Sequence, residues 1–264
     1  MFYLDKDNTV QQFYYSDGKW CLGDVGTLGV KAYPTAGLAA TAYNNNGDIE
    51  LRVYYQGEHR LFQHVIRLLK HSAEDASLNL KELRCVDSKW SHGKLDCSLA
   101  LPGTRLAAVT YGINGGSQTH VFYQANNLEI QDQIFDKKEG WRRGKFTCGY
   151  YLTRLIVIEI YTGSFSPGKG AGRTPLSAVS FSSPNAQVYW REHSQGQIYS
   201  AKLSAGAWSG PKTIKCSVVG YEFSVLEWDT GKRLRLYGQD LKGKLFEHHS
   251  DDNGENWSES SGDL

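Results

Sequence analysis

Short apolar and aromatic segments, separated by turns rich in glycine and asparagine, run along the whole chain. One type of segment, rich in aromatic residues, occurs five times. Each is followed by a second short apolar segment and then by one that begins at a tryptophan. Aromatic and β-branched residues in such short segments predict strands, and the turn residues between them predict antiparallel hairpins. The aromatic segments are residues 1–5, 52–56, 120–124, 187–191 and 235–239.

The order of these segments predicts five repeated units of one build. Four strands repeated about every 40 to 50 residues are typical of β-propeller blades. The first unit begins inside its aromatic strand and so has three strands. We therefore predict an all-β, single-domain propeller over residues 1–264, with five four-stranded antiparallel blades, or six as the alternative. The units are marked by Tyr3, Tyr54, Phe122, Tyr189 and Tyr237, and their last strands start at Trp20, Trp90, Trp141, Trp208 and Trp257.

Two longer spacings between units locate insertions, near 64–86 and 162–175. Within the first insertion, residues 71–84 combine a capping signal with an apolar stripe at helical spacing, so they predict one short surface helix. The first strand of each unit is small and apolar on both faces, as expected for the crowded centre of a propeller. In the fourth unit this strand is either 154–161 or 176–181.

Composition narrows the range of functions. The 29 Lys and Arg residues balance 28 Asp and Glu residues, which disfavours binding to nucleic acid or to a membrane surface. The start of the chain lacks a secretory signal and no apolar stretch is long enough to span a membrane, so we expect a cytoplasmic protein. Five cysteines without a CxxC pair, and histidines without metal-ligand spacing, predict free thiols and no metal or cofactor.

The motifs of several units resemble a known family. Residues 51–56 with 61–63, and 233–239 with 244–247, look like the blade motif of fungal fucose-specific lectins of the Aleuria aurantia type, and residues 5–31 are similar to an early blade. The resemblance covers most of the chain except the insertions, and it implies a six-bladed propeller. It also implies sugar sites made of an Arg from the aromatic strand, a Glu from the next strand and a Trp. Such Arg and Glu side chains bind ring hydroxyls, while the aromatic ring packs on the apolar face of the sugar.

Carried over unit by unit, this motif is complete only in the fifth unit, as Arg235, Glu247 and Trp257. The 12 residues from Arg235 to Glu247 predict opposite positions on neighbouring antiparallel strands. The second unit keeps Arg52 and Trp90 but has Gln63 in place of Glu. The other equivalents are Gln12 in the first unit, His120, Asp132 and Trp141 in the third, and Gln187, Ser200 and Trp208 in the fourth.

The erosion of the motif leads us to favour a lectin-like propeller recruited as a small-molecule biosynthetic enzyme. This hypothesis resembles the hetero-Diels–Alderases of tropolonic sesquiterpene and meroterpenoid biosynthesis. Under this hypothesis, the protein would dehydrate a tropolone-type precursor to a quinone methide. It would then join the quinone methide to a sesquiterpene alkene by (4+2) cycloaddition, without a cofactor. Such chemistry needs a shaped apolar pocket, hydrogen-bond donors and one acid. The catalytic candidates are Arg52, His120, Asp132, Arg235 and Glu247, and the substrate-binding candidates are Tyr54, Tyr55, Gln63, Trp90, Trp190 and Trp257.

The alternative is a fucose-binding lectin with only one or two intact sugar sites. Its partner would be a fucosylated glycan, whereas the enzyme would take an aromatic or terpenoid small molecule. A homodimer is compatible with either hypothesis. A lectin gains avidity from several equal sites, so keeping only one would discard that advantage. Titration with fucose separates the two.

Overall fold

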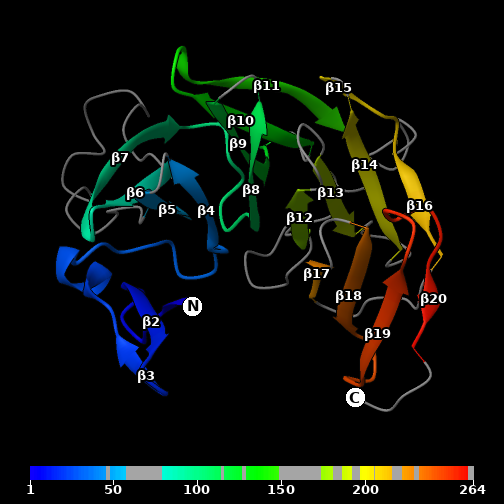
Figure 1. The fold of residues 1–264 in the computed structure, drawn as a ribbon, viewed down its shortest axis with the longest axis horizontal. Helices are drawn as coiled ribbons and strands as arrows, with labels where there is room; N and C mark the ends of the chain where they lie inside the picture. The colour runs from blue at the N-terminus through cyan, green and yellow to red at the C-terminus, as the bar shows by residue number, and fades with distance from the viewer. Residues whose placement is uncertain are drawn as a thin grey trace, which may run out of the picture.

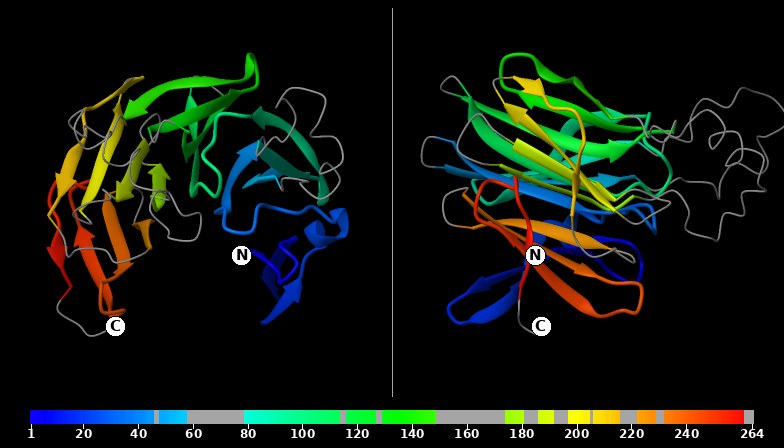
Figure 2. Two further views of the ribbon diagram at one scale, coloured as in Figure 1. Left: turned by 180° about the vertical axis from the view of Figure 1, so that it is seen from behind. Right: turned by 90° about the vertical axis from the view of Figure 1, so that its right-hand side faces the viewer.

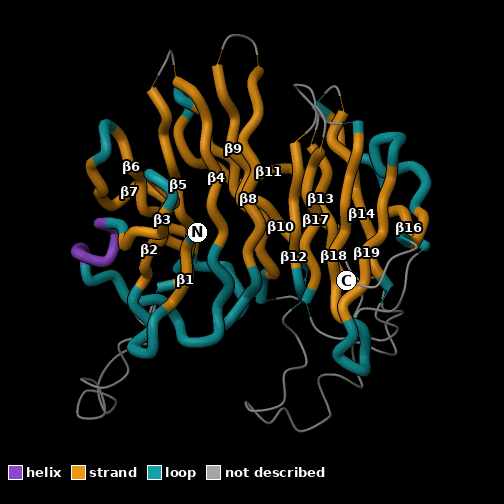
Figure 3. Tube along the Cα trace, turned by 60° about the horizontal axis from the view of Figure 1, so that its bottom comes forward, coloured by secondary structure: helices purple, strands orange, loops and turns teal. Residues whose placement is uncertain are grey.

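The structure is a computed structural model whose strands form five antiparallel sheets around an arc, with the first and last sheets at its two ends (Figure 1). The view from behind in Figure 2 shows the same arc. Within the part that the structure describes, the helical segment is the short 3-10 helix η1 (Asp24–Leu28), drawn in purple in Figure 3. The described residues are 1–45, 48–57, 79–113, 116–126, 129–148, 174–180, 186–191, 197–204, 206–215, 222–228 and 232–260.

Each sheet is built from consecutive strands that pair in sequence order. The first sheet contains β1 (Phe2–Leu4), β2 (Val10–Ser16) and β3 (Lys19–Leu22). The second contains β4 (Ala39–Asn45), β5 (Asp48–Gln56), β6 (Leu80–Val86) and β7 (Lys89–Cys97), and the third β8 (Leu106–Ile113), β9 (Gly116–Gln124), β10 (Ile130–Asp136) and β11 (Gly140–Cys148). The fourth contains β12 (Leu176–Ser180), β13 (Ala186–Arg191), β14 (Ile198–Ser204), β15 (Ala207–Trp208) and β16 (Lys212–Ile214), and the fifth β17 (Phe223–Trp228), β18 (Arg233–Gln239), β19 (Leu245–Ser250) and β20 (Ser258–Glu259).

The first strands of the four complete sheets lie side by side around the centre, in the order β4, β8, β12 and β17 (Figure 1). Small residues such as Ala42, Ala108 and Ala178 allow these strands to approach one another. The predicted five units and three-stranded first unit are confirmed. The first strand of the fourth unit is β12, which answers the choice left open by the sequence, while residues 154–161 lie outside the described residues.

The fourth sheet has a divided last strand. Both β15 and β16 pair with β14, and Gly210 and Pro211 lie between them. Proline has no backbone N–H to donate to a neighbouring strand, so pairing stops there and resumes at Lys212.

The helix predicted over 71–84 is wrong for its last part. Residues 80–84 belong to β6, which pairs with β5 from Leu80 to Cys85, and residues 71–78 lie outside the described residues. The pattern misled because Glu82 and Leu83 are both buried, on opposite faces of the sheet. A buried acid breaks the polar alternation that identifies a strand. The inserted segment therefore ends before β6. Of the second predicted insertion, only Thr174 and Pro175 are described.

The hydrophobic core consists of layers between successive sheets. One cluster lies between the first and second sheets, and others follow between the second and third, third and fourth, and fourth and fifth. Among the described residues, no group of three His, Cys, Asp or Glu side chains is placed to hold a metal ion. None of the described helical segments has the length and apolar character needed to cross a membrane.

Candidate functional site between the sheets

From the second sheet onward, the tryptophan at the start of the last strand contacts the preceding sheet, where its ring lies nearly perpendicular to a ring of that sheet's aromatic strand. A site built from an Arg, an acid and a Trp therefore takes the Trp from the following sheet, which corrects the grouping of Trp90 with Arg52 and of Trp257 with Arg235. The first sheet is marked by Phe2 and not Tyr3. The ring centroids are 5.7 Å apart in Phe2–Trp90, 5.8 Å in Tyr54–Trp141, 5.6 Å in Phe122–Trp208 and 6.1 Å in Tyr189–Trp257.

The acid of the second sheet is Glu82. Glu82 lies opposite Tyr54 in the pairing of β5 with β6, just as Asp132 lies opposite Phe122 in the third sheet. The predicted residue, Gln63, lies outside the described residues. Counting back eight residues from Trp90 identifies Glu82, as the same count from Trp20 identifies Gln12. Across the five units the acid or its equivalent stands eight to ten residues before the tryptophan, and this offset was the sequence signal that our strand assignment missed.

A glycine three residues after the tryptophan makes room for this acid. A Cβ at Gly93 would overlap the carboxylate of Glu82, and one at Gly144 would overlap that of Asp132. The strand register shifts at both acids, so each fourth strand bulges where the carboxylate lies. Gly23 stands in the same relation to Gln12. In these three sheets the glycine of the Trp-x-x-Gly pattern therefore leaves space for the acid or amide side chain of the site.

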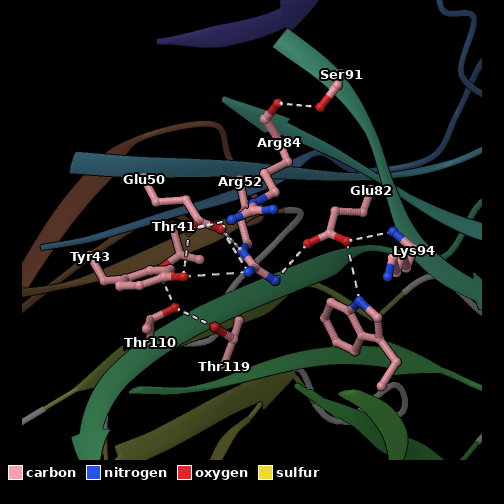
Figure 4. A network of polar contacts seen from close by, with 11 residues as sticks. Thr41, Tyr43, Glu50, Arg52, Glu82, Arg84, Ser91, Lys94, Thr110 and Thr119 are labelled. Atoms are coloured by element: carbon pink, nitrogen blue, oxygen red, sulfur yellow. Dashed lines mark hydrogen bonds and ion pairs between the residues drawn. The ribbon is translucent and has the colours of Figure 1, made fainter. Parts of the chain in front are cut away.

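Arg52 and Glu82 form a buried ion pair between the second and third sheets (Figure 4). Arg52 Nη1 lies 2.8 Å from Glu82 Oε1, and Trp141 of the third sheet donates its indole N–H to Glu82 Oε2 at 3.2 Å. The Arg52 guanidinium lies 4.0 Å from the ring centroid of Phe135. Arg52, Glu82 and Trp141 together thus provide the complete Arg, Glu and Trp motif that the sequence analysis assigned to the fifth unit.

Side chains of the protein occupy the donors of Arg52. Glu50 Oε1 accepts from Arg52 Nε at 2.8 Å, and Glu50 also binds Arg84 and the Tyr43 hydroxyl. Burial opposes ionisation of Glu50, but the hydrogen bonds from Arg84 and Tyr43 and the charge of Arg52 lower its pKa to about 2. Arg52, Glu50 and Glu82 are each at most 3% exposed. This site is closed to solvent and electrically balanced.

The third sheet replaces the Arg–Glu pair with His120 and Asp132. His120 Nδ1 lies 2.7 Å from Asp132 Oδ2, and its Nε2 lies 2.7 Å from the Tyr111 hydroxyl. Trp208 of the fourth sheet lies 5.9 Å from the imidazole centroid. His120 and Asp132 are buried, so this constellation also faces the next sheet and not the solvent.

The fourth sheet has lost the charged pair. Gln187 and Ser200 occupy the equivalent positions and are buried beneath the fifth sheet, whose Trp257 packs on Tyr189. The remaining aromatic candidates also lie in core layers. Tyr55 and Trp90 lie between the first and second sheets, and Trp190 lies between the third and fourth.

The fifth sheet presents the open Arg–Glu pair. Arg235 Nε lies 3.4 Å from Glu247 Oε1, and the two side chains are 27% and 18% exposed. The strand register places Arg235 opposite His249 and Glu247 opposite Tyr237, so the pair is diagonal and not directly opposite as the spacing predicted. A hydrogen bond from Ser260 lowers the pKa of Glu247, with smaller contributions from Tyr237 and Arg235. Glu247 is therefore ionised at neutral pH, and its carboxylate oxygens accept hydrogen bonds.

The arrangement of the sheets explains why this pair is open. The opposite face of the fifth sheet, with Val225, Leu234 and Leu236, packs on the fourth sheet. Because side chains alternate along a strand, Arg235 and Tyr237 point away from the fourth sheet. This face lies at the end of the arc (Figure 1).

The predicted site residues do not meet in one pocket. A cavity of about 240 Å³ lies among the inner strands β4, β8, β12 and β17. None of the predicted site residues lines it. Its polar lining comes from residues such as Thr41, Thr110, Ser180 and Glu227. The candidates instead divide among the interfaces between successive sheets and the open face of the fifth sheet.

Comparison with known proteins gives a consistent result. The model of the family described as "Fungal fucose-specific lectin" matches residues 63–243. A fucose-specific lectin of Aleuria aurantia is 27% identical over 215 residues, which is 80% of this chain and 55% of the relative. One of Aspergillus fumigatus is 23% identical over 247 residues, 89% of this chain and 67% of the relative. The chain thus spans about half the length of the Aleuria relative.

Solved structures of similar proteins have the same fold. The chain matches the six-bladed propeller of Aleuria aurantia lectin with a TM-score of 0.70 and 24% identity, over 98% of this chain and 72% of that one. It matches AofleA from Arthrobotrys oligospora with a TM-score of 0.72 and 23% identity, over 100% of this chain and 68% of that one.

Proposed function

The chain belongs to the fungal fucose-specific lectin family, and we propose that it binds fucosylated glycans through Arg235 and Glu247 of the fifth sheet. The observation that carries this proposal is the solvent-accessible Arg–Glu pair at the position where the family motif places its sugar ligands. A guanidinium and an ionised carboxylate together supply donors and an acceptor for vicinal hydroxyls of one sugar ring.

The buried pair of the second sheet supports a division of roles. Arg52 already donates to two carboxylates, and Phe135 covers one face of its guanidinium. A sugar would have to displace these partners and separate the sheets. We therefore assign Arg52 and Glu82 to the cohesion of the propeller, and the open Arg235–Glu247 pair to binding.

Substitution of Arg235 tests the proposal. Calorimetric titration with α-methyl-L-fucoside should show binding to the wild-type chain. The R235A variant should lose about tenfold or more in affinity, because a hydrogen bond to a charged group contributes about 1.5 to 3 kcal/mol. Arg142 is a matched control, since it is 37% exposed and paired with Glu139 on another sheet, so R142A should bind like the wild type. Equal affinity of R235A and wild type would contradict the proposal.

The recruited-enzyme hypothesis stays a prediction without an observation in its favour. Of its acid and donor candidates, His120 and Asp132 are paired with each other in a core layer, and Arg52 is paired in another. An assay with a tropolone-type precursor and a sesquiterpene alkene would test it directly.

A further inference from the structure

A carboxylate reaches the cavity among the inner strands of the propeller. Among the described residues that line this cavity, the charged one is Glu227 of β17. Val225, two positions earlier in the same strand, packs on the fourth sheet. Since side chains alternate along a strand, Glu227 also points toward the fourth sheet, on the opposite side from Arg235 and Glu247. Its place at the cavity therefore does not depend on the open end of the arc.

The repeated architecture shows that packing does not require a charge at this position. In the strand register, Glu227 directly follows the residue that pairs with the arginine position of the fifth sheet. The equivalent residues of the second, third and fourth sheets are Ala42, Thr110 and Ser180, which are small and neutral. The carboxylate thus adds a charge to the cavity at a level where the other sheets have none.

The charge of Glu227 is not compensated by its surroundings. Partial burial raises the pKa of Glu227, and no cation or hydrogen-bond donor among the described residues offsets this effect. The described lining of the cavity contains no Lys, Arg or His. A carboxylate that has lost part of its hydration gains from a cationic partner. Glu227 is exposed on one side, so a cation from solution can reach it.

A hydroxyl group of the cavity also faces a ligand as an acceptor. Thr41 donates its hydroxyl hydrogen to Thr110 Oγ1 at 3.0 Å, and Thr110 Oγ1 lies 2.8 Å from Thr119 Oγ1 (Figure 4). The hydrogen of Thr41 is therefore used within the protein, while the lone pairs of its oxygen remain. Most of the other described lining is alanine and valine. Acceptor oxygens beside alkyl walls are complementary to an ammonium group on a short alkyl chain.

We propose that the cavity among the inner strands binds a small primary alkylammonium ion, with Glu227 as its anionic partner. An ammonium group has only donors, which match the oxygens of Glu227 and Thr41. The volume of about 240 Å³ is below the about 300 to 1,000 Å³ of drug-sized ligand sites, so the alkyl chain must be short. This site goes beyond the proposed function, because it lies on the other side of the fifth sheet from the Arg235–Glu247 pair.

Titration with n-butylammonium chloride tests this site. Nuclear magnetic resonance spectra of the isotope-labelled chain should show saturable shifts of amides in β12 and β17. E227Q keeps the shape of the side chain and should weaken binding about tenfold or more, the usual effect of removing a charged hydrogen-bond partner. n-Butanol has a similar shape without the charge and should bind more weakly by the same factor. Glu139, an exposed glutamate of the third sheet, gives the matched control E139Q, which should bind like the wild type.

Three results would overturn the site. They are an E227Q chain that binds n-butylammonium as tightly as the wild type, a wild-type chain without saturable shifts, and a wild-type chain that binds n-butanol equally well. Competition by α-methyl-L-fucoside would also overturn it, because the amine would then occupy the Arg235–Glu247 pair. Since the titration contains no sugar, an absence of fucose binding would leave its result unchanged. The melting curve of E227Q should match that of the wild type, as expected for an exposed side chain.

Discussion

At the scale of single residues, the same Arg–acid pair has two different surroundings. Arg52 has Glu50 two residues before it and is enclosed by the third sheet, whereas Arg235 has Arg233 at that position and faces solvent. A buried arginine is stable only when carboxylates neutralise it, because the desolvation of an unpaired charge is costly. The residue two positions before the arginine is therefore an acid where the arginine is buried and a second arginine where it faces solvent.

Glu50 should make the stability of the protein depend on pH. Its pKa is about 2 in the folded chain and 4.5 for the free side chain. A depressed folded-state pKa contributes stability above the unfolded value, and this stability is lost as the pH falls from about 4.5 toward 2. The contribution at neutral pH is on the order of 3 kcal/mol. The free energy of unfolding of E50Q, measured in urea, should therefore be several kcal/mol lower at pH 7 and approach that of the wild type near pH 2.

The control for this prediction is Glu139, whose carboxylate is 56% exposed in a surface ion pair with Arg142. Exposed pairs contribute little, so E139Q should unfold like the wild type at both pH values. An E50Q chain with wild-type stability at pH 7 would show that the Glu50 network does not stabilise the second sheet.

At the scale of the elements, the glycine three residues after the tryptophan in the first three sheets connects strand geometry to the site. Gly93 lies under the Glu82 carboxylate, so alanine there would push this side chain away from Arg52. We expect G93A to lower the melting temperature by several degrees, since it breaks a buried ion pair. In the fourth sheet a Cβ at Gly210 would meet no atom within 4 Å, so G210A should melt like the wild type. Equal melting of G93A and G210A would contradict the role of the bulge.

Much of the element order could be predicted from the sequence, because alternating apolar residues and repeated aromatics identify strands. The third strand of the second unit could not, since the segment 61–63 matches the motif as well as β6 does and Glu82 is a buried acid. The partner of each tryptophan was also missed. Spacing within a unit does not show that Trp141 contacts Tyr54 of the preceding sheet, because this contact depends on the arrangement of the sheets in space.

At the scale of the whole molecule, the layers between sheets differ in chemistry while their geometry repeats. The layer after the second sheet is ionic, that after the third contains His120 and Asp132, and that after the fourth has the neutral Gln187 and Ser200 in their place. In all of them a tryptophan from the following sheet closes the layer. In these three layers the residues at the motif positions thus serve to pack one sheet on the next. On the fifth sheet the Arg–Glu pair remains accessible to solvent.

The most direct test of this account is the number of fucose sites on one chain. Calorimetric titration with α-methyl-L-fucoside should give one site per chain, and R235A should weaken its affinity about tenfold or more while the thermal melting curve stays unchanged. A wild-type chain that binds no fucoside, or an R235A chain that binds it as tightly as the wild type, would contradict the account.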